Sequence, residues 1–319
     1  DPAYPDIMLH VVSGLTSIVN GVTGKYPSAA LRTESEHTSL PADLAVLRKQ
    51  GAPVFVPSLL SLLDSIDISD SVRFQPAVRC LAAWASVAAP ALITNVAKKL
   101  LQLLLSSQSE SSASASWMAV ILALIPYLPD PMLTLLYRTI KPLLSVNESV
   151  SMQKRAYKVL HALLLSHSEL LFKLESRQQI LHVIADSLLT CHVSARHIRL
   201  LCIGSLITGM VDSGCGEEEL RAACGAVLCE TLICLKDANK KSRDGALDLM
   251  KVIYGVLPAR DVLPHLFAGI VGETPTMRSA AIIGLCVLVH QHQQRQGEDE
   301  HNEEYIQLLE SAASITGPV

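Results

Sequence analysis

Basic side chains recur in phase along this chain, each near the start of a stretch that is predicted to be helical. In a row of stacked helices such side chains would form a ladder along one edge, suited to phosphate groups or to an acidic partner peptide. A base at a helix N-terminus opposes the helix dipole, so its recurrence is slightly disfavoured unless something else uses it. The alternative interpretation is a set of solvated helix ends. The candidate partner- or RNA-binding residues are Arg73, Lys154, Arg155, Lys158, Arg196, Arg199, Lys240, Lys241, Arg243 and Arg278.

Catalytic signatures are incomplete in this sequence. Gly24-Lys25 is similar to the end of a phosphate-binding loop, but Tyr26 stands where a Ser or Thr should bind magnesium. There is no H-E-x-x-H and no G-x-S-x-G motif. His290 and His292 are two positions apart, which places them on opposite faces of a helix. We therefore expect no catalytic residues, no cofactor, no metal and no small-molecule substrate.

The eight cysteines are an ordinary number for an intracellular protein of this length, and we expect free thiols. Cys224, Cys229 and Cys234 are five positions apart, so each is turned by about 140° from the last around one helix. The three thiols cannot converge on a single metal ion.

Six stretches share one apolar template, and this repeat predicts the fold. A lead residue is followed by apolar residues three, four, seven and eight positions later, which puts them on one stripe of a helix. The leads are Ala77, Ala119, Ala156, Arg199, Ala246 and Ala281, and the Ala119 stretch continues with Leu122, Ala123 and Tyr127. The leads are about 41 residues apart on average, a period typical of paired helices stacked as HEAT or armadillo units. The predicted class is therefore all-α, a HEAT/armadillo-like α-solenoid of stacked helical hairpins.

The template helices are predicted to be the second members of helical pairs. Their first members are expected at residues 90–105, 131–144, 177–189, 218–235 and 262–271. The expected organisation is irregular N-terminal helices and a loop in 1–70, a HEAT-repeat solenoid in 71–295, and an acidic segment with a final helix in 296–319. Residues 24–41 are predicted to form a loop, and the Ser-rich residues 106–116 a flexible connection.

Composition excludes some classes of protein. Half of the residues are hydrophobic and 4% are aromatic, a balance that favours helices over sheets here. The formal charge is −4, but residues 296–319 hold six acids and no Lys or Arg, so the rest of the chain has a net charge of +2. This is not the charge of a basic DNA-binding domain. The uncharged runs are interrupted by proline and polar residues, so we expect no membrane span, and the missing caps predict a fragment of a longer chain.

Three segments resemble the ribosomal RNA-processing protein 12 family, whose members are HEAT-repeat factors of ribosome assembly. They are SMQKRAYKVL at 151–160, KKSRDGALDL at 240–249 and FAGIVGETPTMRSA at 267–280. Their order and spacing are similar to the central HEAT region of that family, so the resemblance covers roughly residues 70–295. The Ser-rich link at 106–116 and the stretch after residue 289 depart from the pattern.

The resemblance implies a non-catalytic scaffold in the nucleolus and nucleus. It would bind small-subunit precursor particles, both pre-rRNA and assembly factors, and would support rRNA processing or pre-ribosome export, with contact to the nuclear transport machinery. Two alternatives are consistent with the same repeat pattern: a karyopherin-type nuclear transport receptor, and another cytosolic HEAT-repeat protein scaffold. Direct binding of a GTP-loaded small nuclear GTPase would distinguish the receptor.

Overall fold

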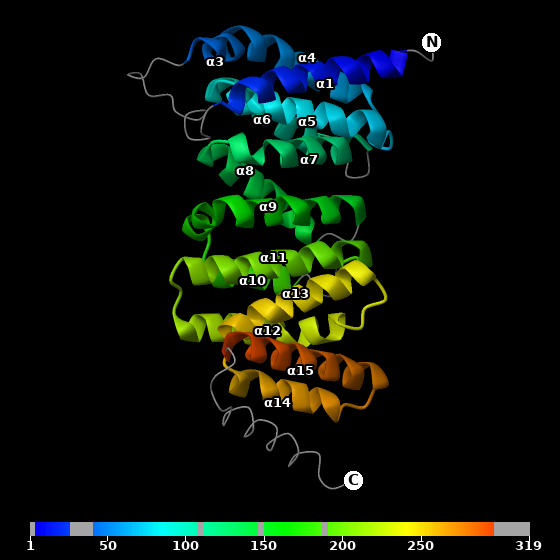
Figure 1. Ribbon diagram of the computed structural model, residues 1–319, viewed down its shortest axis with the longest axis vertical. Helices are drawn as coiled ribbons and strands as arrows, with labels where there is room; N and C mark the ends of the chain where they lie inside the picture. The colour runs from blue at the N-terminus through cyan, green and yellow to red at the C-terminus, as the bar shows by residue number, and fades with distance from the viewer. Residues whose placement is uncertain (1–3, 26–40, 107–111, 146–149, 187–190, 297–319) are drawn as a thin grey trace. The chain divides into compact units, whose positions relative to one another are not determined.

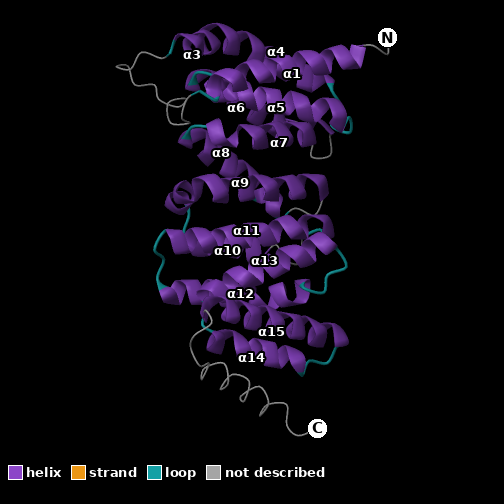
Figure 2. Cartoon of the chain, viewed as in Figure 1, coloured by secondary structure: helices purple, strands orange, loops and turns teal. Residues whose placement is uncertain are grey.

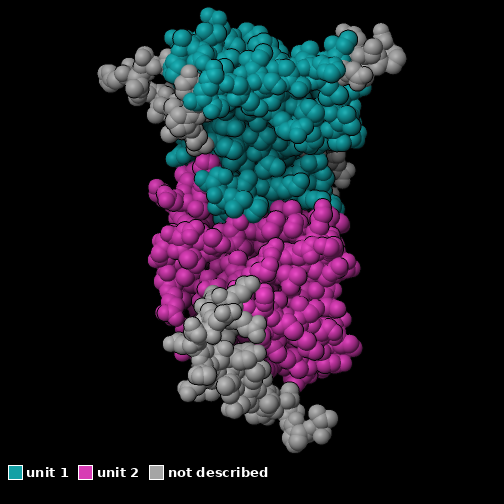
Figure 3. Space-filling model, viewed as in Figure 1, with its two compact units in different colours: residues 1–166 teal, residues 167–319 magenta. Residues whose placement is uncertain are grey.

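The computed structural model describes residues 4–25, 41–106, 112–145, 150–186 and 191–296, and all regular secondary structure within these ranges is helical (Figures 1 and 2). The chain divides into two compact units, Asp1–Ser166 and His167–Val319 (Figure 3). The division lies within α9 (Val150–Leu174), where His167 has non-helical backbone angles of φ −144° and ψ 34°. The predicted domain bounds at 70 and 295 are not tested by this division and stay predictions.

Unit 1 is built of helical hairpins packed side by side. The first hairpin is formed by α4 and α5, and α5 also packs against α1. The next hairpin is formed by α6 and α7, in which α7 packs against α5 and α6 packs against α8. The helices are α1 (Tyr4–Thr23), α3 (Ala42–Val46), α4 (Ala52–Ser65), α5 (Ser71–Val87), α6 (Pro90–Ser106), α7 (Ser112–Leu124), α8 (Asp130–Ile140) and the first part of α9. Short turns of π- or 3-10 helix occupy Leu47–Gly51, Ile125–Tyr127 and Pro142–Leu144.

Unit 2 repeats the same arrangement. The second helices α11, α13 and α15 pack one on the next, and the first helices α10 and α12 also pack together. The helices are the rest of α9, α10 (Arg177–Asp186), α11 (Val193–Asp212), α12 (Glu217–Cys234), α13 (Lys240–Val256), α14 (Ala259–Ile270) and α15 (Pro275–Gln296). The predicted pairing of first and second helices, and with it the all-α solenoid class, is confirmed.

Local sequence signals set the helix starts. The side chain of Asp70 accepts a hydrogen bond from the backbone nitrogen of Arg73, and Asn239 caps α13 by accepting one from Lys241 at 2.9 Å. Pro129 immediately precedes α8, and Pro275 is the first residue of α15, where its missing N–H costs no hydrogen bond.

The apolar template forms the core of the hairpins. The stretches that begin at Ala77, Ala156 and Ala246 are buried at every template position. Leu160 is 1% exposed and Ile253 is fully buried, as the template predicts. The stripe is therefore the surface along which neighbouring helices pack.

One close approach requires glycine at a template position of α15. A Cβ atom at Gly284 would lie 2.8 Å from the side chains of Leu232 and Leu266. The hydroxyl of Tyr254 donates a hydrogen bond to the Gly284 carbonyl at 2.9 Å. The absence of a side chain thus lets α15 pack closely against α12, α13 and α14.

The register predicted for the second of the six template stretches is wrong by two positions. Two residues turn a helix by about 200°, so Ala119 and its predicted partners are only half-buried. The predicted lead is the small Ala119, whereas the lead in α7 is the large indole of Trp117. The buried stripe is Trp117, Val120, Ile121, Leu124 and Ile125.

The predicted connection at 106–116 is also corrected in part. Ser112–Leu124 is helical, and the side chain of Ser116 is 7% exposed, so the end of the Ser-rich run belongs to α7. Residues 107–111 lie outside the described residues, as do 26–40 of the predicted N-terminal loop and 297–319 of the acidic segment.

The structure bears on two further expectations. The cysteines are free thiols, of which Cys229 and Cys286 are exposed. Within the described part of the chain, no helix is long and apolar enough to cross a membrane.

Candidate interaction surface

The ten predicted basic residues do not form one class of side chain. All lie within the first three turns of second helices: four on α5 and α9 of unit 1, and six on α11, α13 and α15 of unit 2. What separates them is whether the charged group is already bound within the fold.

Arg199 is part of the core, and its placement on an exposed edge is wrong. Its side chain is fully buried, and its guanidinium forms an ion pair with Glu230 of α12, whose side chain is 9% exposed. The same guanidinium donates hydrogen bonds to the carbonyls of Ile184, at 2.8 Å, and Ala185, at 3.4 Å. These carbonyls lie in the last turn of α10. Arg199 therefore joins three helices and is not available to a partner.

Arg196 and Arg243 meet at the loop between α12 and α13. Arg196 forms an ion pair with the Asp237 carboxylate, whose side chain is 3% exposed. Arg243 donates to the backbone carbonyls of Asp237 and Ala238 at 2.8 and 2.9 Å. Burial alone would lower the pKa of Arg196, but the hydrogen bond and charge of Asp237 outweigh it and raise that pKa. One aspartate thus links the starts of two successive second helices.

Arg278 repeats the contact of Arg243 one hairpin later. Its guanidinium donates to the carbonyls of Gly272 and Glu273, both at 2.9 Å. In both arginines the bonded carbonyls lie six and five positions earlier in the chain. The recurrence of bases at this position is therefore explained in part by the need to bind the loop carbonyls between paired helices.

Lys240 and Lys241 are the most available members of the set in unit 2. The side chain of Lys240 is 78% exposed and contacts Asp244 at 2.7 Å, a pairing of neighbouring turns that contributes little to stability. The hydrogen bond from Lys240 lowers the pKa of the Asp244 carboxyl. Lys241 is exposed, and its ammonium has no partner among the described residues. These two amines can bind an anion without breaking a buried contact.

In unit 1 the candidate bases differ in the same way. Arg73 contacts its own helix cap, Asp70, at 3.3 Å. Lys158 is exposed but has a contact within the fold. Lys154 and Arg155 are half-buried with no ion pair to a described residue, and burial lowers the pKa of the Arg155 guanidinium. The buried Nε of Arg155 has no hydrogen-bond partner.

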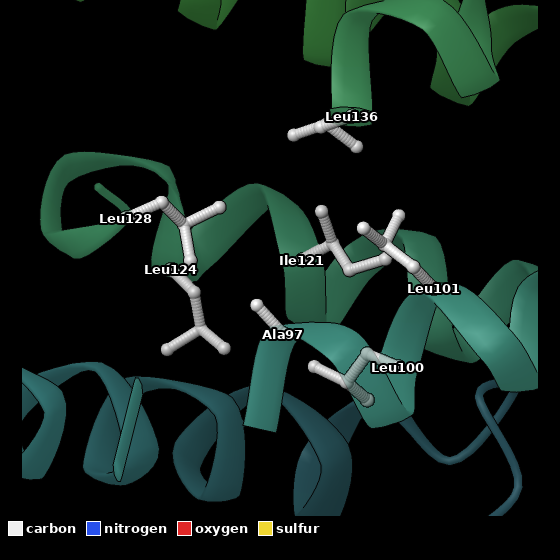
Figure 4. A pocket seen from close by; sticks show the side chains of 7 residues that line it. All are labelled: Ala97, Leu100, Leu101, Ile121, Leu124, Leu128 and Leu136. Atoms are coloured by element: carbon white, nitrogen blue, oxygen red, sulfur yellow. The ribbon is translucent and has the colours of Figure 1, made fainter. Parts of the chain in front are cut away.

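The cavities of unit 1 are apolar or open. The smallest, of about 10 Å³, is lined by seven aliphatic side chains of α6, α7, α8 and the turn between α7 and α8 (Figure 4). A hollow of about 460 Å³ lies between α1 and α4 and is lined mainly by aliphatic residues. Within the described residues no group of three His, Cys, Asp or Glu side chains is arranged to hold a metal ion.

No family model matches the sequence. An RRP12-like protein of Gallus gallus is 26% identical over 214 residues, which make up 64% of this chain and 16% of that protein. The chain thus spans less than a fifth of the length of this curated relative. The similarity agrees with the resemblance noted from the three sequence segments.

Two solved structures align with this chain at low TM-scores. A crystal structure of an engineered protein aligns with a TM-score of 0.45 and 16% identity, covering 74% of this chain and 97% of its own. A designed armadillo repeat protein aligns with a TM-score of 0.40 and 16% identity, covering 73% of this chain and 99% of its own.

Proposed function

We propose that this chain is part of a non-catalytic HEAT-repeat scaffold in ribosome biogenesis, acting in the nucleolus and nucleus. It binds small-subunit precursor particles through pre-rRNA and assembly factors, and supports rRNA processing or pre-ribosome export. The observation that carries the proposal is the similarity to an RRP12-like protein across 214 residues of stacked hairpins. Stacked hairpins offer long surfaces to large partners, which fits this role.

The available amines of α13 are the first part of this surface to test. Lys240→Glu with Lys241→Glu reverses two exposed charges and keeps Arg243, whose bonds to the loop carbonyls are structural. Since contacts to phosphate and acidic groups depend on these charges, we expect a weaker association with precursor particles and an unchanged melting temperature. Co-sedimentation of the tagged protein with precursors of the small subunit, at several salt concentrations, measures this.

A matched control is Lys236→Glu with Lys251→Glu, which changes the net charge equally on the same unit. If both variants and the wild type sediment with precursors alike, the α13 amines have no role in binding. If the wild type does not sediment with precursors at all and instead binds a GTP-loaded small nuclear GTPase directly, the transport-receptor alternative replaces the proposal.

A further inference from the structure

Positive charge is unevenly distributed between the two units. Unit 1 holds 13 Lys and Arg against 11 acids, a net charge of +2, whereas unit 2 holds 13 bases against 19 acids, a net charge of −6. Within unit 1, residues 71–166 hold nine bases against three acids, a net charge of +6, although most of the predicted basic ladder lies in unit 2. A polyanion would be attracted to residues 71–166 more strongly than to unit 2.

Most bases of unit 2 are engaged within the fold, while several of unit 1 are not. Arg196, Arg199, Arg221, Arg243 and Arg278 all bond to carboxylates or backbone carbonyls. In unit 1 the exposed bases that have no hydrogen bond or ion pair to another described residue include Arg79, Lys98, Lys99 and Arg138.

Three of these bases share the outer face of two neighbouring first helices. Leu100 of α6 and Leu136 of α8 line the same small cavity, so both helices turn these sides toward the packed interior (Figure 4). Lys98 is two residues before Leu100, and Arg138 is two residues after Leu136. Two residues correspond to about 200° of helix rotation, so both charges point away from the core.

Lys99 and its neighbours complete this face. Lys99 is exposed next to Lys98, and the only acid of α6, α7 and α8 in the described residues is Asp130, at the start of α8. We call Lys98, Lys99 and Arg138 the α6–α8 basic face. All three side chains are exposed, and none of them has a hydrogen bond or ion pair to another described residue.

We infer that the α6–α8 basic face binds the phosphate backbone of RNA. The inference rests on the proposed function, in which the chain binds pre-rRNA. It assigns the RNA contact to the first helices of unit 1, in place of the predicted ladder of bases on the second helices. A backbone of phosphates needs only spaced cations, and Arg138 can bind one phosphate with two parallel hydrogen bonds. An acidic peptide usually also fills an apolar pocket, and the cavity of about 10 Å³ that α6 and α8 help to line is too small to take a side chain.

The test is RNA binding by the full chain in which Lys98, Lys99 and Arg138 are all replaced by glutamine. Each phosphate contact to a single strand contributes about 0.7 to the salt dependence of log affinity, so the loss of three contacts should flatten that slope by about 2. Between 50 and 200 mM salt the wild type should therefore lose about 20-fold more affinity than the variant. Fluorescence anisotropy with labelled single-stranded RNA, RNA duplex and DNA duplex measures the slopes.

The control variant replaces Lys173, Lys236 and Arg260 of unit 2 by glutamine, which removes the same charge from exposed positions. An equal slope for both variants and the wild type would overturn the assignment to this face while leaving the association with precursor particles as a separate result. Equal binding of DNA and RNA would overturn the choice of RNA. If the variant of the α6–α8 basic face loses binding to polyglutamate but binds RNA as the wild type does, the face would be assigned to an acidic protein. If the wild type binds no RNA, both the inference and the RNA part of the proposed function would be overturned.

Discussion

Replacement of Glu230 by glutamine isolates the buried charge pair that holds α11 against α10 and α12. Glutamine keeps the length of the side chain and one acceptor oxygen, so the substitution removes charge and little volume. Arg199 remains fully buried and stays protonated at any pH at which the protein is folded. The variant therefore leaves an uncompensated guanidinium charge in the core.

The expected destabilisation follows from that residual charge. Breaking a buried ion pair by removal of one partner costs about 3–5 kcal/mol, and the retained hydrogen bond to glutamine recovers about 1 kcal/mol. We expect Glu230→Gln to lower the free energy of unfolding by about 3 kcal/mol. Arg199→Met should cost at least as much, because it also removes the hydrogen bonds from Arg199 to the carbonyls of Ile184 and Ala185. The double variant with Glu230→Met should cost clearly less than the sum of the two single variants, since both charges leave together.

Urea denaturation followed by far-ultraviolet circular dichroism measures these changes, with the slope compared between variants. Lys251→Gln is the control, because Lys251 pairs with Asp248 on the surface and its loss should change stability by less than about 1 kcal/mol. A Glu230→Gln protein within about 1 kcal/mol of the wild type, or additive costs in the double variant, would refute the reasoning that this pair supports the junction.

Two further predictions concern the core. Leu160→Ala and Ile253→Ala should each lower the free energy of unfolding by about 2–5 kcal/mol, because each leaves a cavity along a packed stripe; denaturation curves equal to the wild type would show that the stripe does not carry the packing. Burial raises the pKa of the Cys224 thiol to about 12. At pH 8 this thiol should therefore resist alkylation in the folded chain, while the exposed Cys229 thiol reacts. Mass spectrometry of the labelled peptides measures both reactions, and faster labelling of Cys224 than of Cys229 would contradict the prediction. The same shift predicts that stability falls as pH rises above about 9, since the unfolded thiol then loses its proton and the folded one keeps it.

The helices and their pairing were predictable because burial recurs with helical spacing. Ala156 and Ala246 lead stretches in which every template position is apolar, and all of these positions are buried. The register of the second template stretch was predicted wrongly, because the small Ala119 was assumed to be its lead residue. Several phases of an apolar stretch fit the template, and only packing shows that Trp117 takes the lead position.

The candidate site was less predictable, and Arg199 shows why. Its place at the head of a buried stripe predicted burial, while its charge favoured the surface, and the sequence holds no local signal that selects between them. The partner that allows burial, Glu230, lies 31 positions away on another helix. The α6–α8 basic face had a visible signal in the charge count of residues 71–166, but its members are separated by about 40 positions and lack the regular spacing of the ladder.

The sequence alone determined the all-α class, the helical pairs and the repeat length, because spacing along one helix decides which side chains share a face. Only the tertiary structure decided which bases serve the fold and which are free, because an ion pair or a bound carbonyl depends on residues that the chain brings together from different helices. The division between structural arginines and available lysines is therefore a property of the stacked hairpins.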